Sequence, residues 1–298
     1  MPHELWVVIL AAGAGRRLAE VTGGVPKQFW RAEGGSSLLK QTLDRFGPLA
    51  PRSRTVIVVN AKHLPHLAAS DVTGPVPWLM IQPEDRGTAA GVLLALTAII
   101  ERAPESVVVI TPSDHGVLDD ATFRGRIVEA VREVGRRDEI VLFGVEPTQP
   151  HTDYGWISLG PSSSGRGLRP VISFVEKPAF DTAAHLFVSG AVWNTMIIVG
   201  RARALWDLYV RHLPELAGRF AGIIERPPAK RAGFLDSLYR TLPTYDFSRD
   251  LLTHTRGLSA AVWPATVGWS DLGTPARLRE WQRTVNTQAS STAAISAA

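Results

Sequence analysis

The segment Leu10-Ala11-Ala12-Gly13-Ala14-Gly15-Arg16-Arg17-Leu18 decides how the first part of this chain folds. It follows the apolar run Leu5–Leu10, which is typical of a short buried strand. Its small residues let the backbone approach a ligand closely, and its arginines and the lysine of Pro26-Lys27-Gln28 supply positive charge. A strand that opens into such a loop suits a polyphosphate, because free amides and fixed cations face the anion.

Two common phosphate-binding loops do not fit this segment. A dinucleotide fingerprint requires a third glycine where Leu18 stands. A P-loop requires a Gly-Lys pair, and the chain has none. An ordinary turn between a strand and a helix stays open as the alternative, since small residues are common in such turns.

The composition limits the class of protein. With 298 residues, 45% of them hydrophobic, the chain is long enough for one large domain with an ample core. It contains no cysteine, which excludes disulfides and thiolate metal sites and fits a cytoplasmic setting. The net charge of +4 is carried by scattered basic residues, so we expect a small anionic ligand and no nucleic acid.

We expect no membrane association and no signal peptide. No apolar stretch approaches the roughly 20 residues of a membrane span. Glu4 precedes the short apolar run near the N-terminus, and the arginines follow that run, which is the reverse of a signal peptide.

The first half of the chain alternates between apolar runs and helix-like segments, which predicts a parallel sheet with helices on both faces. The runs that predict strands are 5–10, 55–60, 78–81, 106–110 and 139–145, and the segments that predict helices are 38–46, 88–100 and 121–134. We therefore expect an α/β fold with a Rossmann-like, mostly parallel sheet. Ligands of such sheets bind beyond the carboxyl ends of the strands.

The second half predicts a smaller, mixed portion. Strands are expected over 154–159 and 168–175, around a turn at 162–167, and over 191–199 and 258–263. Helices are expected over 201–213, 249–254 and 274–283, with a proline-rich break at 226–228. The Ser/Thr/Ala-rich tail 286–298 predicts disorder.

Two aspartates are candidate metal ligands. Asp114 follows the strand predicted over 106–110 and would face the ligand crevice, where Mg²⁺ takes one or two carboxylates plus phosphate oxygens. Its alternative role is a helix N-cap, for which Asp119 and Asp120 are better placed. Asp271, in Gly268-Trp269-Ser270-Asp271-Leu272-Gly273, offers a second carboxylate or a turn cap.

Further polar residues lie at strand and helix ends. Lys177, in Glu176-Lys177-Pro178, is either a phosphate ligand or a solvated strand end. Asn194 either binds a sugar hydroxyl or satisfies its own turn. Tyr154-Gly155-Trp156 allows a close backbone approach beside aromatic rings, which pack on sugars or in cores. Arg86-Gly87-Thr88 begins a long helix whose amides would meet an anion or a base, or would simply be capped.

Together these motifs resemble the sugar-nucleotide pyrophosphorylases, and among them the mannose-1-phosphate guanylyltransferase (GDP-mannose pyrophosphorylase) family. The resemblance runs from about Trp6 to Trp281 in the family's order, with Phe-Val-Glu-Lys-Pro intact at Phe174–Pro178. The other matching segments are Leu10–Leu18, Pro26–Phe29, Gly87–Ala89, Pro112–His115, Thr152–Ile157, Trp193-Asn194 and Gly268–Asp271.

The resemblance implies a nucleotide-diphospho-sugar transferase fold in a single domain over 1–285, with a nucleotide-binding half over about 1–145 and a sugar-binding half over about 146–285. It implies transfer of a nucleotidyl group from a nucleoside triphosphate, most simply GTP, to a sugar 1-phosphate, most simply mannose 1-phosphate, with release of pyrophosphate. It also implies Mg²⁺ as cofactor and a homodimer as one arrangement of the chain. No isomerase domain follows the last motif, so a bifunctional enzyme is not expected.

By position, the resemblance also assigns roles to residues. Arg17 and Lys27 would be catalytic, holding the triphosphate and stabilising the departing pyrophosphate. Asp114 and Asp271 would hold the metal. The nucleotide would contact Leu10, Ala11, Ala12, Gly13, Gly15, Arg16, Arg17, Lys27, Arg86, Gly87, Thr88 and Asp114. The sugar phosphate would contact Tyr154, Gly155, Glu176, Lys177 and Asn194.

The sequence departs from the family pattern at the expected base and sugar positions. Ala12 replaces a glycine, Gly87 an asparagine, and Thr195-Met196 stands where Ser-Gly is usual. The base and the sugar therefore stay open. The opening loop also resembles methylerythritol-phosphate cytidylyltransferases, which lack the later motifs. A catalytically silent protein that binds a nucleotide sugar is the alternative from another class.

Overall fold

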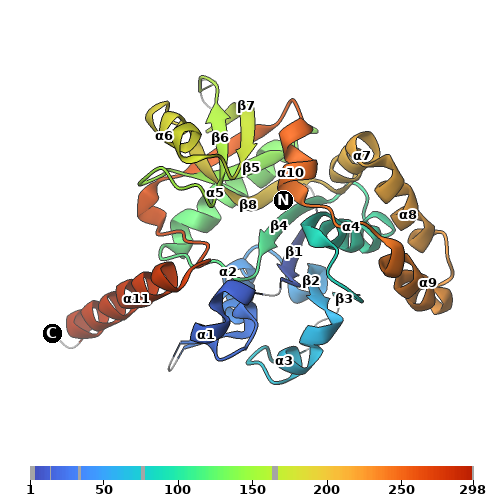
Figure 1. Ribbon diagram of the computed structural model, residues 1–298, viewed down its shortest axis with the longest axis horizontal. Coiled ribbons are helices and arrows are strands. Elements are labelled where there is room, and N and C mark those ends of the chain that lie inside the picture. Colours follow the sequence, from blue (N-terminus) through green and yellow to red (C-terminus); the bar gives the residue numbers. More distant parts are fainter. Residues whose placement is uncertain (1–3, 14, 33–34, 75–77, 163–166, 297–298) are drawn as a thin grey trace.

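The strands of the chain lie in one mixed sheet, seen in Figure 1. The computed structural model describes residues 4–13, 15–32, 35–74, 78–162 and 167–296. The strand order is β3-β2-β1-β4-β8-β5-β9-β7-β6. The strands are β1 (Leu5–Ala11), β2 (Thr55–Asn60), β3 (Trp78–Gln82), β4 (Val107–Pro112), β5 (Val141–Val145), β6 (Gly155–Leu159), β7 (Leu168–Glu176), β8 (Val192–Arg201) and β9 (Ser259–Trp263).

Helices flank this sheet. They are α1 (Ala19–Thr22), α2 (Leu38–Phe46), α3 (Leu64–Ala68), α4 (Gly87–Ile100), α5 (Asp120–Val134), α6 (Phe180–Val188), α7 (Ala202–His212), α8 (Pro214–Ile224), α9 (Pro228–Thr241), α10 (Phe247–Asp250) and α11 (Pro275–Ser296). Short 3₁₀ turns carry two segments of the site, η1 (Arg16–Leu18) and η2 (Lys27–Phe29).

The first half of the sheet is parallel, as the unbroken apolar runs predict. Strand β1 lies between β2 and β4, with Val8 opposite Val56 on one side and Ile110 on the other. Because these strands run in the same direction, the loops after β1 and β4 emerge at one edge of the sheet.

The second half is mixed to a greater extent than the sequence predicts. Strand β8 is antiparallel to β4, β5 and β6, and β7 is antiparallel to β6 and β9, whereas β5 and β9 are parallel. The pairings β8-β5-β9-β7-β6 return to β8 and close a ring of strands. Strand β8 therefore belongs to both halves, and the α/β class is confirmed.

Side chains of β1 alternate between two cores, because successive residues of a strand point to opposite faces. Trp6 and Val8 pack in the core beneath α4, α7, α8, α9 and α10. Val7 and Ile9 pack in the core beneath α2, α5 and α6. The sheet is thus covered on both faces.

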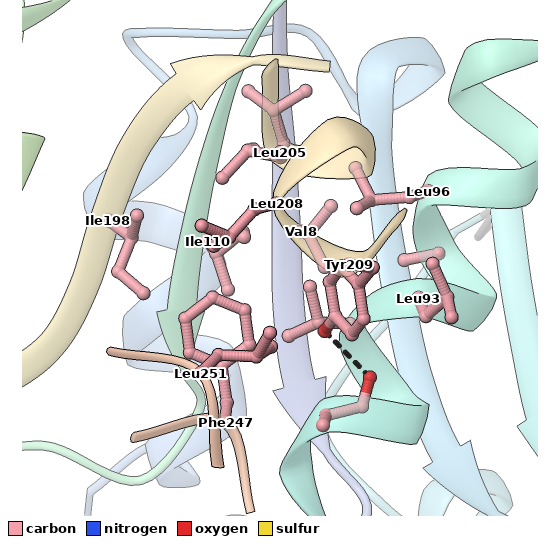
Figure 2. Packing of buried hydrophobic residues seen from close by; sticks show 14 of the residues in the cluster. Val8, Leu93, Leu96, Ile110, Ile198, Leu205, Leu208, Tyr209, Phe247 and Leu251 are labelled. Carbon is pink, nitrogen blue, oxygen red and sulfur yellow. Dashed lines mark hydrogen bonds between the residues drawn. The ribbon is translucent and has the colours of Figure 1, made fainter. Parts of the chain in front are cut away.

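Helix α7 is joined to α4 in the first of these cores. Figure 2 shows the ring of Tyr209 among Val8, Leu93 and Phe247, with its hydroxyl directed at α4. The Tyr209 hydroxyl donates a hydrogen bond of 2.8 Å to the carbonyl oxygen of Ala89. Both residues are fully buried, so this bond holds the first turn of α4 against α7.

The last helix differs from the sequence prediction. A helix is predicted over 274–283 and disorder over 286–298, whereas α11 continues to Ser296. Neither glycine nor proline interrupts the chain after Pro275, and alanines favour the helix, so nothing local ends it. The predicted turn at 162–167 lies largely outside the described residues. Helices α1, α3, α6, α8 and α9 are not predicted from the sequence.

Among the described residues, no helix has both the length and the apolar character needed to cross a bilayer.

Replacing Tyr209 by phenylalanine tests the contact between α4 and α7. The change removes the bond to Ala89 and keeps the ring, so we expect the free energy of unfolding to fall by about 1 kcal/mol. Urea denaturation followed by circular dichroism measures it. Tyr245→Phe removes the hydroxyl of a half-buried tyrosine that makes no side-chain hydrogen bond with the described residues, and it serves as the control. Equal stability of the two variants would contradict the assignment.

Candidate active site

A cleft of about 340 Å³ lies beyond the carboxyl ends of β1 and β4 and extends to β6, β7 and β8. It brings together residues that are far apart in the sequence. Of the residues that the sequence singles out, the cleft is lined by Leu10, Gly13, Arg17, Thr88, Asp114, Tyr154, Gly155, Glu176, Lys177, Asn194 and Asp271. The cleft is therefore the place where these side chains can act on one ligand.

Gln28 holds the loop that follows β1. Its buried amide nitrogen donates to the carbonyl oxygens of Ala11, at 2.7 Å, and of Gly13, at 3.2 Å. Because the Gln28 amide binds these two carbonyl oxygens, this part of the loop has a fixed conformation. Gln28 lines the cleft as well and was not among the predicted site residues.

The rest of the loop turns at Gly15, whose φ is +58°. A Cβ on Gly15 would lie 3.0 Å from the backbone nitrogen of Lys27, so glycine permits both the left-handed conformation and this close approach. Arg17 follows in η1, is exposed and lines the cleft. Arg16 opens the same turn. Ala14 lies outside the described residues.

Lys27 lies beneath the cleft. Its side chain is only 5% exposed, and its Nζ lies 3.0 Å from Oδ2 of Asp114. The same nitrogen donates a hydrogen bond to the carbonyl oxygen of Asp271. A single buried cation thus joins η2, the end of β4 and the segment that carries Asp271.

Asp114 stands at the floor of the cleft and is ionised. Burial by itself raises the pKa of this carboxyl. The positive charge of Lys27 and a smaller contribution from His115 lower the pKa by more than burial raises it, so the net pKa is below the ordinary value. Its side chain keeps 32% exposure and so remains accessible to a ligand.

His115, next to Asp114, is a neutral structural residue. Its Nδ1 lies 3.2 Å from the indole nitrogen of Trp269, which donates to it, and the two rings meet edge to face. Burial lowers the pKa of His115 to about 4, although Asp114 opposes this shift. The ring is therefore uncharged near neutral pH.

A local backbone pairing sets the segment that carries Asp271 beside the segment that carries Asp114. Gly116 and Ser270 exchange two hydrogen bonds, of 2.9 Å and 3.0 Å, which set the segment after β9 beside the segment after β4. Leu272, the residue after Asp271, has a φ of +47°, a conformation that bulky residues rarely adopt. Strain of this kind persists where the surrounding structure fixes it, and it clusters at functional sites.

The carboxylate of Asp271 is held by several donors. The Tyr154 hydroxyl donates to its Oδ1 at 2.9 Å, and the backbone amide of Gly273 donates to the same oxygen at 3.1 Å. The guanidinium of Arg277, from α11, lies 3.0 Å from Oδ1. Arg277 was not predicted as a site residue, because no sequence motif links α11 to the cleft.

Gly155 leaves room for the side chains of Glu176 and Asn194 at the opposite wall. Strands β6 and β7 place Gly155 opposite Glu176. A Cβ on Gly155 would lie 2.7 Å from Oε2 of Glu176 and 3.3 Å from Cβ of Asn194, so any larger residue would displace them. Burial raises the pKa of Glu176, and Lys177 opposes that shift.

Two residues of this wall have left-handed backbones. Lys177 has a φ of +46° and Met196 a φ of +58°. The Lys177 side chain is 62% exposed, with its Nζ 3.4 Å from Oε1 of Glu176. The carboxamide oxygen of Asn194 accepts from the Met196 amide at 3.2 Å, so Asn194 satisfies its own turn while it lines the cleft.

Arg86 does not line the cleft. Backbone groups of the segment 239–245 occupy the space at the N-terminus of α4. Nε of Arg86 donates to the carbonyl oxygen of Tyr239 at 2.8 Å. The Ala89 amide donates to the carbonyl oxygen of Tyr245 at 3.1 Å. Gly87, at a φ of +83°, faces that same carbonyl at a distance too short for any Cβ. The amide of Ala89 is therefore not free for a base, and the asparagine of the family pattern would clash at Gly87.

Several residues lining the cleft were not among the predicted site residues, although Gln28, Asp153 and Trp269 lie within matching segments. Besides Gln28 they include Asp153, Thr195, Asp246, Ser248 and Trp269. Asp246 caps α10 by accepting from the Arg249 amide at 2.9 Å. Its position in a capping pattern before a short helix is the one signal that the sequence holds, and that signal indicates a cap and no site.

The chain matches the nucleotidyl transferase family over residues 6–288 and belongs to that family. It is 29% identical over 277 residues to the xanthan biosynthesis protein XanB of Xanthomonas campestris, and 28% identical over 290 residues to the mannose-1-phosphate guanylyltransferase of Escherichia coli. These alignments cover 89% and 93% of the chain. The chain spans only 57% and 59% of the length of these two relatives.

Solved structures share the fold. A Thermus thermophilus protein, named mannose-1-phosphate geranyltransferase, aligns with a TM-score of 0.79 at 26% identity, over 91% of this chain and 76% of its own. A Helicobacter pylori protein, named mannose-6-phosphate isomerase, aligns with a TM-score of 0.70 at 21% identity, over 90% of this chain and 99% of its own. Its identity is low enough that it bears on the fold alone.

Stability should depend on pH through His115. Its folded-state pKa of about 4 lies below the ordinary 6.5, so between these values the unfolded chain binds the additional proton. We expect the stability advantage of the wild type over His115→Phe to shrink by about 2 kcal/mol between pH 7 and pH 5. Urea melts at both pH values measure it, with exposed His185→Phe as the control. A difference that does not change with pH would refute the assignment.

Proposed function

We propose that this protein transfers a nucleotidyl group from a nucleoside triphosphate to a sugar 1-phosphate in the cytoplasm and releases pyrophosphate, with GTP and mannose 1-phosphate as its substrates. One observation carries the proposal. A single cleft unites the loop after β1, the two aspartates and the Glu176-Lys177 wall. Family membership and the names of the relatives at 28–29% identity agree with it.

The loop after β1 and its cations would bind the triphosphate. The loop provides backbone amides at a strand end, and Arg17 provides an exposed positive charge at the cleft. Lys27, paired with Asp114 beneath the cleft, would add its positive charge behind the phosphates. Both charges would stabilise pyrophosphate as it leaves.

The sugar phosphate would approach from the other wall. Lys177 is the exposed cation there, and the carboxylate of Glu176 is an acceptor for sugar hydroxyls. The phosphate oxygen of the sugar would then attack the α-phosphorus of the nucleotide. Such transfer depends on positioning and on charge neutralisation, so no protein nucleophile is required.

The two aspartates fit a divalent cation. Asp114 and Asp271 are hard oxygen donors that line the same cleft, and Mg²⁺ prefers one or two carboxylates together with phosphate oxygens. The described residues contain no group of three or more protein ligands, so phosphates and water would complete the set. When bound, the metal would neutralise charge on the nucleotide phosphates.

The base is the part of the proposal that the substitutions bear on most directly. The carbonyl oxygen of Tyr245 occupies the space that a side chain at position 87 would need. The asparagine side chain of the family pattern therefore has no room in this chain. A different base, including cytosine, is therefore the alternative within the same reaction. A silent binding protein is disfavoured, since Arg17, Lys27, Asp114 and Asp271 are all present.

Pyrophosphate release from GTP, measured with and without mannose 1-phosphate in the presence of Mg²⁺, tests the reaction. We expect turnover that needs both substrates, and a loss of about 10²-fold or more in kcat for Asp114→Asn, since an electrostatic ligand of the reacting phosphates is removed. Asp181→Asn, an exposed aspartate on α6, is the matched control. Absence of turnover with every nucleotide and sugar phosphate tested would reject the enzymatic proposal.

Ligand-induced stabilisation identifies the base and the sugar. A substrate that binds only the folded state stabilises it by RT ln(1 + L/Kd), where L is the free ligand concentration, so at equal concentration the tighter ligand raises the melting temperature more. We expect GTP to stabilise the protein more than ATP, CTP, UTP or dTTP at equal concentration, and mannose 1-phosphate more than its epimers. A larger shift with CTP would assign the cytidylyl reaction instead.

A further inference from the structure

Both candidate metal ligands are paired with a buried or nearly buried cation. Lys27 faces Asp114 at 3.0 Å, and Arg277 faces Asp271 at 3.0 Å. The lysine side chain is 5% exposed and the arginine side chain 13% exposed, so solvent screens neither pair well. The negative charge of each aspartate is therefore already compensated by a positive charge of the protein.

Arg277 approaches Asp271 from outside the cleft. Its second contact is from Nη2 to Oδ2 of Asp271, at 3.3 Å, so the guanidinium meets both carboxylate oxygens. The same nitrogen lies 3.4 Å from Oδ2 of Asp153, and the guanidinium carbon lies 4.9 Å from the centre of the Tyr154 ring. Arg277 lines the neighbouring cavity and is absent from the lining of the cleft. It acts on Asp271 and is not positioned to touch the substrate.

Helix α11 holds this arginine in place. Leu278 and Trp281 pack in a small core with Leu18, which follows Arg17, and with Leu272, which follows Asp271. Gly116 lies so close to the Trp281 indole that a Cβ there would overlap it. The helix is thus fixed to the segments that carry Arg17 and Asp271, and Arg277 has little freedom to leave Asp271.

We propose that Arg277 is a positioning residue that keeps Asp271 charge-paired and a divalent cation out of the free site, so that the metal enters together with the nucleoside triphosphate. The proposal rests on the function proposed above. A cation beside a carboxylate opposes the binding of a second cation. A triphosphate changes this balance, because it brings its own metal ligands and offers Lys27 an alternative to Asp114.

Mn²⁺ binding to the full chain tests the proposal without relying on activity. Electron paramagnetic resonance counts free Mn²⁺ in titrations with and without GTP, and the Mn²⁺ that GTP binds without protein is measured separately and subtracted. For the wild type we expect weak binding to the free protein and much tighter binding with GTP. For Arg277→Met we expect the Kd of Mn²⁺ for the free protein to fall about tenfold, because one opposing charge is removed. In the double variant with Asp271→Asn this gain should disappear.

Matched variants separate the charge effect from other changes. Arg279→Met is the same substitution on an exposed arginine two residues along α11 and should leave Mn²⁺ binding unchanged. Arg277→Lys keeps the charge and should bind Mn²⁺ as the wild type does. Circular dichroism confirms that each variant is folded, and if Arg277→Met is unfolded, Arg277→Gln takes its place in the same comparison.

The outcomes distinguish this inference from the proposed function. Tight Mn²⁺ binding by the free wild type, or an unchanged Kd in folded Arg277→Met or Arg277→Gln, overturns the inference even where Mn²⁺ and GTP bind together. Failure of GTP and Mn²⁺ to bind together to the wild type overturns the proposed function, and the inference with it.

Discussion

The contact of the Lys27 ammonium with Asp114 and with the carbonyl oxygen of Asp271 is the interaction on which the site depends. A buried charge is costly unless it is paired and hydrogen-bonded, so burial of this lysine requires both partners to be in place. The partners come from β4 and from the segment after β9, whereas Lys27 itself follows the loop after β1. Gly15 makes the arrangement possible by letting the loop pass against the Lys27 backbone. The two halves of the chain are thus joined at the floor of the cleft.

Around that floor, the sheet and one short segment set the walls. Strand β8 pairs with β4 of the parallel half and with β5 and β6 of the mixed half, so the wall with Glu176 has a fixed position relative to the loop after β1. On the other side, the chain before α10 crosses the start of α4. The Thr88 hydroxyl accepts from the Phe247 amide at 2.8 Å, and Asp246 and Ser248 then line the cleft. The start of α4 is therefore shaped by a distant segment of the chain.

What the sequence predicts well is local. The ranges 38–46 and 55–60 match α2 and β2 residue for residue. An amphipathic repeat over the first range predicts only a helix, and an unbroken β-branched run over the second predicts only a strand. Eleven of the predicted site residues also line one cleft, because strand ends meet at one edge of the sheet. The residues that were not predicted, Gln28, Asp246 and Arg277, act through partners at long range. Arg86 was assigned to the site by its place before a helix, and the chain near Tyr239 and Tyr245 occupies that place instead.

The charge of the cleft explains why one buried and one nearly buried cation are needed. Among the described side chains, five carboxylates line it, from Asp114, Asp153, Glu176, Asp246 and Asp271, whereas the lining cations are Arg17 and Lys177. A polyphosphate would be repelled by such a surface if nothing lay behind it. Lys27 and Arg277 lie behind it and compensate Asp114, Asp153 and Asp271 from below. The carboxylates can then remain in the cleft as metal ligands. A polyphosphate that arrives with its own metal is attracted to the cleft, because the metal binds the carboxylates and the cations face the phosphates.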